Sequence, residues 1–324
     1  MHTPLPAGFH MRTASLDDVP SVVEVGRASN LVEIGEFDVH ESWVHDEWMR
    51  PRFDPSTDAW IVTEPGGAVV AAAYTWDEEP NVLFDSAGWV HPEYRGQGIG
   101  TALVLAIERR AMRDAAAGSA GSAPRVLHSY DADASGAFDP DASGARVLFE
   151  ELGYAPEREY LHMQIDVQGR VERGATPVGV TIRPREEADD RAIVGVVAEA
   201  FDAPWTYEEA QQEWSVSQEY DPTLWLVAVE GDVVVAELMA YVTDGRGQIS
   251  SLAVRDGWRR RGIATALLRA SFATFRDRGV ADVRLNVDRD NVTGATRLYE
   301  RAGMRLRRRW LVVAKTIAQG GRPQ

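Results

Sequence analysis

The sequence predicts an α/β (α+β) protein made of two tandem copies of one domain, each a mixed sheet flanked by helices. Residues 254–268, V-R-D-G-W-R-R-R-G-I-A-T-A-L-L, repeat residues 90–104, V-H-P-E-Y-R-G-Q-G-I-G-T-A-L-V, with seven identical positions spaced 164 residues apart. Apolar segments of strand character also alternate with helical apolar spacing, in the same order in both halves. A repeat of this length indicates a duplicated domain, and strands that alternate with helices form a sheet covered by helices on both faces.

The first half is predicted to contain strands and helices in a definite order. Ser15 begins the first helix, because its hydroxyl can cap the helix and two acidic residues follow within the first turn. The elements expected are a strand at 9–12, a helix from 15, a helical region within 33–50, strands at 59–63, 68–76 and 82–90, helices at 101–117 and 145–153, and a strand at 154–167.

Residues 115–144 are rich in Ala, Gly, Ser and Asp, and we predict a loop or weakly structured insertion there. The residues from Asp131 imitate a calcium-binding loop. However, Ala142 stands where such a loop needs a bidentate glutamate, and no helix pair is evident beside it. We therefore expect no metal site.

The second half repeats the order of the first after a linker at residues 168–179. The elements expected are strands at 180–183, 224–229, 233–242, 247–254, 282–287 and 304–317, and helices at 186–201, 207–220, 265–278 and 293–302. We therefore place the first domain at residues 1–167 and the second at residues 180–324.

The composition is that of a globular protein, and 324 residues suffice for two domains of ordinary size. The chain has no cysteine, which excludes disulfides, thiolate zinc sites and a cysteine nucleophile. The first residues show no signal-peptide pattern, and no apolar run approaches the roughly 18 residues of a membrane span. We therefore expect a cytoplasmic protein with no membrane partner.

Charge is divided unevenly between the halves. Residues 1–170 hold 12 Arg against 28 Asp and Glu, whereas residues 171–324 hold 22 Lys and Arg against 22 Asp and Glu. An acidic half favours a cationic substrate or partner and disfavours nucleic acid. Acidity that serves only solubility is the alternative.

In each copy a predicted strand ends in an Arg/Gly turn that opens a helix. Such a turn directs free backbone N–H groups and the positive end of the helix dipole at one point, which suits a phosphate or pyrophosphate. Gly262 allows close approach of the backbone, Ala264 keeps the next contact small, and the neighbouring arginines add positive charge. The candidate ligand-binding residues are Val90, Arg95, Gly96, Gln97, Gly98, Ile99, Gly100 and Thr101, and Leu252, Ala253, Val254, Arg259, Arg260, Arg261, Gly262, Ile263, Ala264 and Thr265. The spacing is not that of a dinucleotide fingerprint, and no Walker lysine is present.

A second element, N-x-x-x-A-x-x-x-Y-E-x-x-G, runs from Asn291 to Gly303. The Arg/Gly turn followed by this element resembles the GCN5-related N-acetyltransferases (GNAT superfamily) over nearly the whole chain, and the two-copy layout resembles that of the mycothiol synthases. The resemblance implies a splayed sheet whose fourth and fifth strands hold acetyl-CoA as cosubstrate, with Asn291 among the coenzyme-binding residues. It also implies N-acetylation of a primary amine. We expect a small-molecule amine as acceptor, with a protein terminus as the alternative, and a monomer or homodimer, because two halves of one chain can pack as an internal pseudo-dimer. A non-catalytic acyl-CoA sensor or scaffold is the alternative.

Acetyl transfer to an amine needs a base, donors for the thioester oxyanion and an acid for the departing thiolate. Because there is no cysteine, direct attack on acetyl-CoA in a ternary complex is favoured. Tyr299 is the candidate acid, since the resemblance places a tyrosine at this position beside the coenzyme sulfur. The resemblance also implies that a backbone N–H group within residues 251–254 donates to the oxyanion. Glu237 is the candidate base, acting through a water, although a solvated strand residue or a water chain is an open alternative. Gln248, where some relatives carry glutamate, cannot accept a proton.

The first half lacks the candidate acid. Sliding the sequence by 150 residues places Phe149 at the position of Tyr299 and Asp141 at that of Asn291. Phenylalanine has no proton to donate. We therefore predict a degenerate first domain and a catalytic second domain. The first domain then binds acetyl-CoA without turnover, shapes the other site, or uses Tyr130 instead.

Two further clusters have two interpretations each. A basic group is expected to face solvent or to pair with the acidic half, rather than to bind nucleic acid: Arg305, Arg307, Arg308 and Arg309. Four tryptophans are expected either to pack in the core or to line a pocket for the acceptor: Trp205, Trp214, Trp225 and Trp310.

Overall fold

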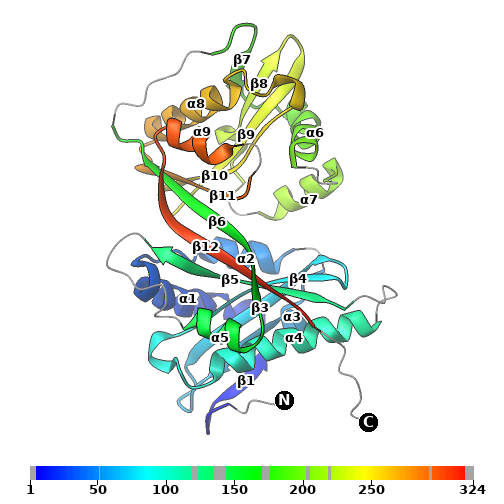
Figure 1. The fold of residues 1–324 in the computed structure, drawn as a ribbon, viewed down its shortest axis with the longest axis vertical. Helices are drawn as coiled ribbons and strands as arrows, with labels where there is room; N and C mark the ends of the chain where they lie inside the picture. The colour runs from blue at the N-terminus through cyan, green and yellow to red at the C-terminus, as the bar shows by residue number, and fades with distance from the viewer. Residues whose placement is uncertain are drawn as a thin grey trace. The chain divides into compact units, whose positions relative to one another are not determined.

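A computed structural model describes residues 5–50, 52–117, 123–134, 144–169, 176–201, 205–217, 220–291 and 294–317. The chain forms two compact units. Unit 1 consists of Met1–Tyr160 and Arg308–Gln324, and unit 2 consists of Leu161–Arg307 (Figure 1).

Unit 1 is a mixed sheet with the strand order β1-β2-β3-β4-β5-β12. Its pairs are antiparallel except β4 with β5, which is parallel. Its elements are β1 (His10–Thr13), η1 (Leu16–Asp18), α1 (Val19–Ile34), α2 (Glu41–Trp48), α3 (Pro55–Asp58), β2 (Ala59–Thr63), β3 (Val69–Glu79), β4 (Leu83–Val90), η2 (Pro92–Tyr94), α4 (Ile99–Ala117), β5 (Arg125–Ala134), α5 (Ala145–Glu151), the start of β6 (Ala155–Asp166) and most of β12 (Arg305–Thr316).

Unit 2 repeats this plan with the strand order β6-β11-β10-β9-β8-β7. Its elements are the remainder of β6, β7 (Thr181–Pro184), η4 (Glu187–Asp189), α6 (Asp190–Phe201), α7 (Tyr207–Val216), η5 (Pro222–Leu224), β8 (Leu226–Glu230), β9 (Val233–Thr243), β10 (Arg246–Val254), η6 (Asp256–Trp258), α8 (Ile263–Asp277), β11 (Asp282–Asp288) and α9 (Ala295–Arg301). In Figure 1, α8 and α9 lie on one side of the yellow strands of this unit, and α6 and α7 lie on the other.

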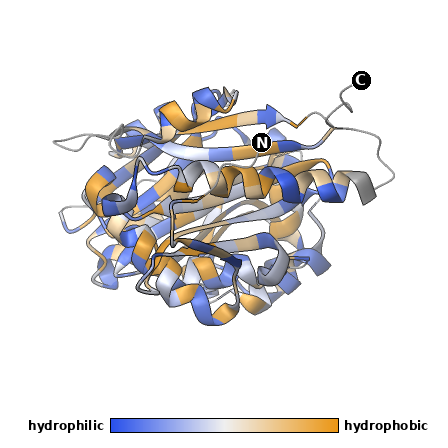
Figure 2. Ribbon diagram, turned by 90° about the horizontal axis from the view of Figure 1, so that it is seen from below, coloured by the Kyte–Doolittle hydropathy of each residue, from blue (hydrophilic) through white to orange (hydrophobic). Residues whose placement is uncertain are grey.

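The helices and strands are amphipathic, as Figure 2 shows by the alternation of orange and blue along them. Helix α8 buries Ile263, Leu267 and Phe272 against the strands of unit 2. These residues repeat at helical spacing, so one stripe of the helix leaves water and packs on the sheet. Within the described ranges, no helix combines the length and apolar character needed to span a bilayer.

The two parallel strand pairs separate toward their carboxyl ends. Strand β10 pairs with β11 at Gly247–Val283 and Gln248–Arg284, whereas it stays paired with β9 as far as Val254. In unit 1, β4 and β5 pair at their starting residues in the same way. The predicted splayed mixed sheet, present twice, is confirmed.

One predicted loop is wrong. Residues 125–134, placed in a weakly structured insertion, form the internal strand β5 of unit 1. The Ala, Gly, Ser and Asp content around them concealed a short alternation in which Val126 and His128 are buried. Asp131, the first residue of the calcium-like segment, belongs to this strand, and the segment after residue 134 lies outside the described residues until Gly144. Among the described residues no group of His, Cys, Asp or Glu could hold a metal ion.

The two units differ from the predicted boundaries at 167 and 180 because they exchange their final strands. Residues from Arg308 to Thr316 of β12 complete the sheet of unit 1 by pairing with β5. Residues of β6 from Leu161 onward belong to unit 2, where Val167 N–H donates to the Ala281 carbonyl (2.9 Å). Sequence order alone does not reveal such an exchange, because it does not state which strands pair in the folded sheets.

Arg308 shows how the exchanged strand is held in unit 1. Its buried guanidinium pairs with Asp38 and lies 3.5 Å from Asp131. Arg309 lies 3.6 Å from Glu159. The prediction that these arginines pair with acidic residues of the first half is confirmed for both.

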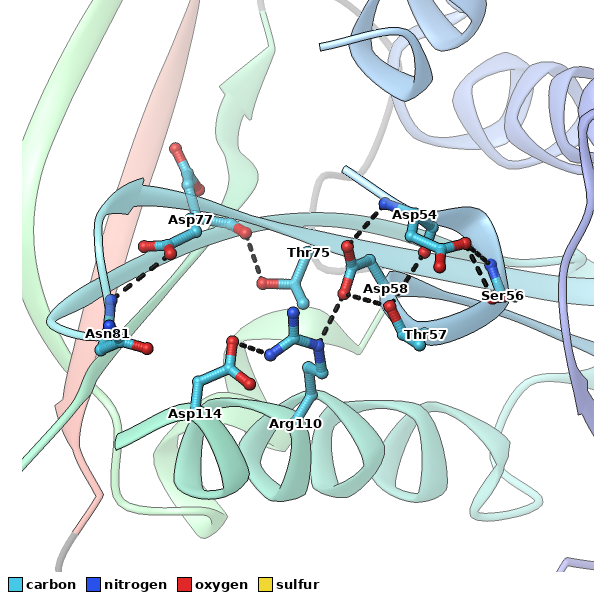
Figure 3. A network of polar contacts seen from close by, with 10 residues as sticks. Asp54, Ser56, Thr57, Asp58, Thr75, Asp77, Asn81, Arg110 and Asp114 are labelled. Carbon is cyan, nitrogen blue, oxygen red and sulfur yellow. Dashed lines mark hydrogen bonds and ion pairs between the residues drawn. The ribbon is translucent and has the colours of Figure 1, made fainter. Parts of the chain in front are cut away.

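Each helix that follows an Arg/Gly turn is tied by an arginine to an Asp-Pro segment. In unit 1, Arg110 of α4 binds Asp58 (2.6 Å) and Asp114, and Asp58 also accepts from Thr57 (Figure 3). In unit 2, Arg278 after α8 binds Asp221 (3.0 Å). The first tie holds the middle of α4, and the second holds the C-terminal end of α8.

Candidate active site

Glu237 is a fully buried carboxylate in the middle of β9. It lies opposite Ala253 of β10 and Val227 of β8. The Ser251 hydroxyl donates to Oε1 (2.6 Å), whereas Oε2 is buried without a hydrogen-bond partner in the described structure. A buried acceptor without a partner is costly, so Oε2 is a group prepared to take a proton or a hydrogen bond from a ligand or water.

Burial raises the pKa of Glu237 from its ordinary value to about 7, although the Ser251 hydrogen bond and the nearby backbone N–H groups of Ala253 and Met239 oppose the shift. Desolvation penalises the charged form of a carboxyl group, which is the direction seen here. A carboxylate with a pKa near neutrality can accept and release a proton at physiological pH.

Tyr299 lies on α9 and belongs to the same buried core as Leu238 and Ala253 of β9 and β10. Burial is the main cause that raises its pKa to about 12, and the negative charge of Glu237 is the second. The two candidate catalytic residues are therefore close enough to interact electrostatically. A phenol with this pKa stays protonated at neutral pH and can serve as a proton donor.

A β-bulge separates the two halves of β10. The register against β9 shifts between Ile249 and Ser251, and Ser250 is exposed with its hydroxyl donating to the Met239 carbonyl (3.3 Å). Bulges redirect side chains and are common beside active sites. The bulge precedes the segment 251–254, from which an oxyanion donor is expected.

The Arg/Gly turn of unit 2 has the backbone form of an anion site. Arg260 and Gly262 have positive φ angles of 61° and 85°, and the Gly262 carbonyl accepts from Ala266 N–H (3.1 Å) at the start of α8. The backbone N–H groups that precede Ala266 in the helix, including those of Ile263 and Ala264, therefore have no acceptor within the helix. They point beyond its N-terminus.

The three arginines of this turn have different surroundings. Arg259 donates to the Val254 carbonyl (3.0 Å) and pairs with Asp256 (2.8 Å), so it braces the turn. Arg261 pairs with Glu230 (2.5 Å). Arg260 is exposed, and it alone of the three has no carboxylate partner among the described residues.

The other predicted residues of the second half lie around this turn. Leu252, Ala253 and Val254 form the end of β10, and Thr265 lies in the first turn of α8. Asn291 follows β11, where its N–H donates to the Asp288 carbonyl (3.1 Å). Gln248 pairs with Arg284 at the base of the separating strands.

The turn of the first half has the same backbone and a different electrostatic character. Gly96 and Gly98 have φ angles of 73° and 79°, and Ala102 N–H donates to the Gly98 carbonyl (3.0 Å). Arg95 is the single arginine of this turn, and it binds Ser29 (2.7 Å) and Glu33. The turn also contains Gln97, Ile99, Gly100 and Thr101, and follows Val90 of β4.

Strand register identifies the first-half counterpart of Glu237, which the sequence alone did not reveal. Trp89 and Ala253 are equivalent by the repeat, and their partners are Ala72 and Glu237 respectively. The counterpart of Tyr299 is Phe149, which is buried and stacks on His128. Unit 1 therefore has neither a carboxylate nor a phenol at these two positions.

Ser251, the hydrogen-bond partner of Glu237, was also missed from the sequence. The pair of serines inside the otherwise apolar segment 249–254 was the available signal. The tryptophans divide between the units: Trp214 contacts Trp205 and Trp225 in unit 2, whereas Trp310 lies beside Arg308 in unit 1. Trp225 is a buried core residue.

Comparison with known proteins agrees with this geometry. The sequence profile of the Acetyltransferase (GNAT) family matches residues 27–122 and 193–304, one region in each half. The chain belongs to the GNAT family. It is a tandem GNAT N-acetyltransferase, as the resemblance in its sequence predicted, and it resembles the mycothiol synthases.

Two relatives carry the name mycothiol acetyltransferase. The protein from Kineococcus radiotolerans is 31% identical over 228 residues, covering 68% of each chain. The protein from Saccharopolyspora erythraea is 25% identical over 299 residues, covering 86% of this chain and 94% of its own.

Solved structures match the whole chain. A GCN5-related N-acetyltransferase from Sphaerobacter thermophilus is 33% identical with a TM-score of 0.82, covering 98% of both chains. A tandem GNAT protein from the clavulanic acid biosynthesis pathway shares the fold, with 16% identity, a TM-score of 0.75 and coverage of 97% of this chain and 100% of its own.

Proposed function

We propose that this N-acetyltransferase moves the acetyl group of acetyl-CoA to a primary amine in its second half, by direct attack in a ternary complex. The observation that carries the proposal is the pair formed by Glu237 and Tyr299, whose first-half counterparts are Ala72 and Phe149. At the equivalent positions, the second half has a carboxylate and a phenol, whereas the first half has neither.

The second half has the features needed to hold a coenzyme A ester. The open N–H groups at the start of α8 would bind the pyrophosphate, and exposed Arg260 would add the positive charge that is not neutralised locally. Beyond Gln248, β10 separates from β11, and its free edge would receive the pantetheine arm as an extra strand.

The proton transfers follow from the two pKa values. Glu237 takes a proton from the acceptor ammonium, directly or through a water, and the neutral amine attacks the thioester carbonyl carbon. Backbone N–H groups at 251–254 stabilise the oxyanion while the C–N bond forms. The C–S bond then breaks and Tyr299 donates its proton to the departing thiolate. The extra proton on the acetylated nitrogen passes to the tyrosinate through water, and Glu237 releases its proton to solvent.

The acceptor we propose is a small molecule with a primary amine. The mycothiol acetyltransferases in the comparison support a small-molecule acceptor, and the acidic first half supports a cationic one. Gln248 cannot act as a base, so an acceptor that depends on a second carboxylate in β10 would react poorly.

A coenzyme A release assay over a panel of small amines, including the acceptor of mycothiol acetyltransferases, tests the proposal. Tyr299→Phe should lower kcat roughly a hundredfold or more while acetyl-CoA still binds by calorimetry. The matched control is Tyr207→Phe, which removes a hydroxyl from α7 and should keep the wild-type rate. Acetyl-CoA binding without release for any amine would contradict the proposal and support a sensor.

A further inference from the structure

Serines at the same position of the sequence repeat have different contacts in the two halves, close to the point where the parallel strands separate. The bulge in β10 means that the register against the neighbouring antiparallel strand sets Ser86 level with Ile249 rather than with Ser250. Ser86 of β4 and Ser250 of β10 are 164 residues apart, the spacing of the repeat. Each lies just beyond the last parallel pair, Phe84–Val126 in unit 1 and Gln248–Arg284 in unit 2. Their contacts therefore report how the sheet opens in each half.

In unit 2 the strands are left open at this point. The bulge excludes Ser250 from the register and exposes it, and its hydroxyl bonds to β9 rather than to β11. Asn286 of β11, the residue two positions beyond Arg284, is also exposed. Its Oδ1 lies 2.8 Å from His162 Nδ1 of β6, so the side chains of Ser250 and Asn286 each bond to another neighbouring strand and do not tie β10 to β11.

In unit 1 the same point is closed. Strand β4 has an unbroken register with β3 from Val90 to Asp85, so the bulge is missing. Ser86 is 3% exposed, and its hydroxyl donates to the Leu127 carbonyl of β5 (2.6 Å). Its Oγ also lies 2.5 Å from His128 Nδ1. This Ser86–His128 tie joins β4 to β5 where the main-chain pairing has ended.

The tie is supported by buried groups from other elements of unit 1. His128 Nε2 lies 3.1 Å from the Tyr154 hydroxyl, which donates to Glu108 (3.1 Å), and Lys315 donates to the same carboxylate (2.7 Å). The Phe149 ring stacks on His128 with centroids 4.8 Å apart. Opening the strands would break two hydrogen bonds of Ser86, one buried and one partly buried, and expose this packed group.

The phosphate turn of unit 1 is weakened as well. It has one arginine in place of three, and Arg95 is committed to Glu33 and Ser29 inside the unit. The charge that would hold a pyrophosphate is therefore balanced by a neighbouring carboxylate.

We infer that the first half is a closed copy: the Ser86–His128 tie fills the place of the thioester, and the chain binds one acyl-CoA, in its second half. This rests on the proposed function of the second half. The first half then supplies a folded sheet and an acidic surface, and it does not form a second coenzyme-binding site.

Calorimetric titration of the full chain with acetyl-CoA tests the inference with a matched pair of variants. Gly262→Val changes the Arg/Gly turn of the second half, and Gly98→Val changes the equivalent residue in the turn of the first half. Both glycines have positive φ angles, so a branched side chain should distort each turn in the same way. We expect one equivalent bound by the wild type, at least tenfold weaker binding in Gly262→Val, and wild-type binding in Gly98→Val. Two equivalents, or loss of binding only in Gly98→Val, would overturn the inference and leave N-acetyltransfer intact. No binding by the wild type would overturn the proposed function as well.

Thiol labelling provides a second test that does not depend on damaging a turn. The chain has no cysteine, so Ser86→Cys and Ser250→Cys each introduce a single thiol. We expect the thiol at position 250 to react readily with a disulfide reagent and to be protected by acetyl-CoA. The thiol at position 86 should react at least a hundredfold more slowly and be unaffected by acetyl-CoA. Rapid labelling at position 86 that acetyl-CoA suppresses would contradict a closed first half.

Discussion

Glu237 stands where a strand of this sheet would ordinarily carry an apolar residue. Its first-half counterpart is Ala72, which packs without a desolvation cost, whereas a buried carboxylate with one unpartnered oxygen reduces stability. The Ser251 hydroxyl offsets part of that cost. Local destabilisation at a group with a near-neutral pKa is typical of a residue kept for chemistry.

Replacing Glu237 with glutamine should remove the proton acceptor and keep the shape of the side chain. The raised pKa of about 7 means that the wild-type carboxyl is protonated and inactive below that pH, so kcat/KM should rise as pH increases through 7. Glu237→Gln should be slower by about 10²–10⁴ and should lose this rise. Initial rates from pH 5.5 to 9 measure both effects, with the exposed Asp232→Asn as control; an unchanged rise in the variant would exclude Glu237 as the base.

The same variant should gain stability as it loses activity. Glu237 has an ordinary pKa of 4.5 when unfolded and about 7 when folded, so the native state holds an extra proton between these values. Stability therefore falls as pH rises from 4.5 to 7, by about 3 kcal/mol at 1.36 kcal/mol per pKa unit, and stays lower above pH 7. Urea unfolding at pH 5 and pH 8 should show this loss in the wild type and less of it in Glu237→Gln. Equal pH dependence in both proteins would refute the shifted pKa.

At the scale of elements, the helix behind each Arg/Gly turn is anchored by an arginine, within α4 in unit 1 and just after α8 in unit 2. The anchors differ in burial. The side chains of Arg110 and Asp58 are 14% and 5% exposed, whereas those of Arg278 and Asp221 are 38% and 40% exposed. A buried ion pair that loses one partner leaves an uncompensated charge, whereas an exposed pair is screened by water.

The two anchors should therefore respond differently to the same substitution. Arg110→Met should lower the free energy of unfolding by about 3–5 kcal/mol, because Asp58 remains buried without its cation. Arg278→Met should lower it by less than about 1 kcal/mol. Denaturant unfolding of the two variants measures both losses. Equal losses would contradict the argument that the buried ion pair is costlier to break than the exposed one.

At the scale of the whole molecule, exchange of the final strands makes each sheet depend on a segment from the other half of the sequence. Unit 1 needs β12, which pairs along β5 from Arg125 to Ala134 and places Val313 and Ile317 in its core. Without β12, the edge of β5 and these apolar contacts would be exposed.

A fragment of residues 1–167 should consequently be unable to fold alone. We expect it to be insoluble or to show rapid amide exchange in β4 and β5, because the edge of β5 is unpaired. Coexpression with residues 168–324 should restore a soluble complex that has acetyltransferase activity. A stable, protected 1–167 monomer would show that unit 1 does not require the exchanged strand.

The sequence determined the repeated plan of this protein by itself. The 164-residue repeat, the glycines of both turns and the Asn291–Gly303 element predicted two splayed sheets and the GNAT family. Predictions of this kind succeed because glycine at positive φ, helix spacing and strand alternation are local requirements of the chain. The candidate residues Glu237 and Tyr299 could be named, but their proximity could not.

Tertiary structure alone decided the relations that depend on pairing and burial. Strand β5 was hidden by the composition around it, the exchange of β6 and β12 leaves no mark in sequence order, and register was needed to align Ala72 with Glu237. Ser86 and Ser250 occupy the same position of the sequence repeat, but they differ in burial and in the strand to which they bond. The physical reason is that register, burial and hydrogen-bond partners are properties of residues distant in the chain, and they exist only once the sheets have formed.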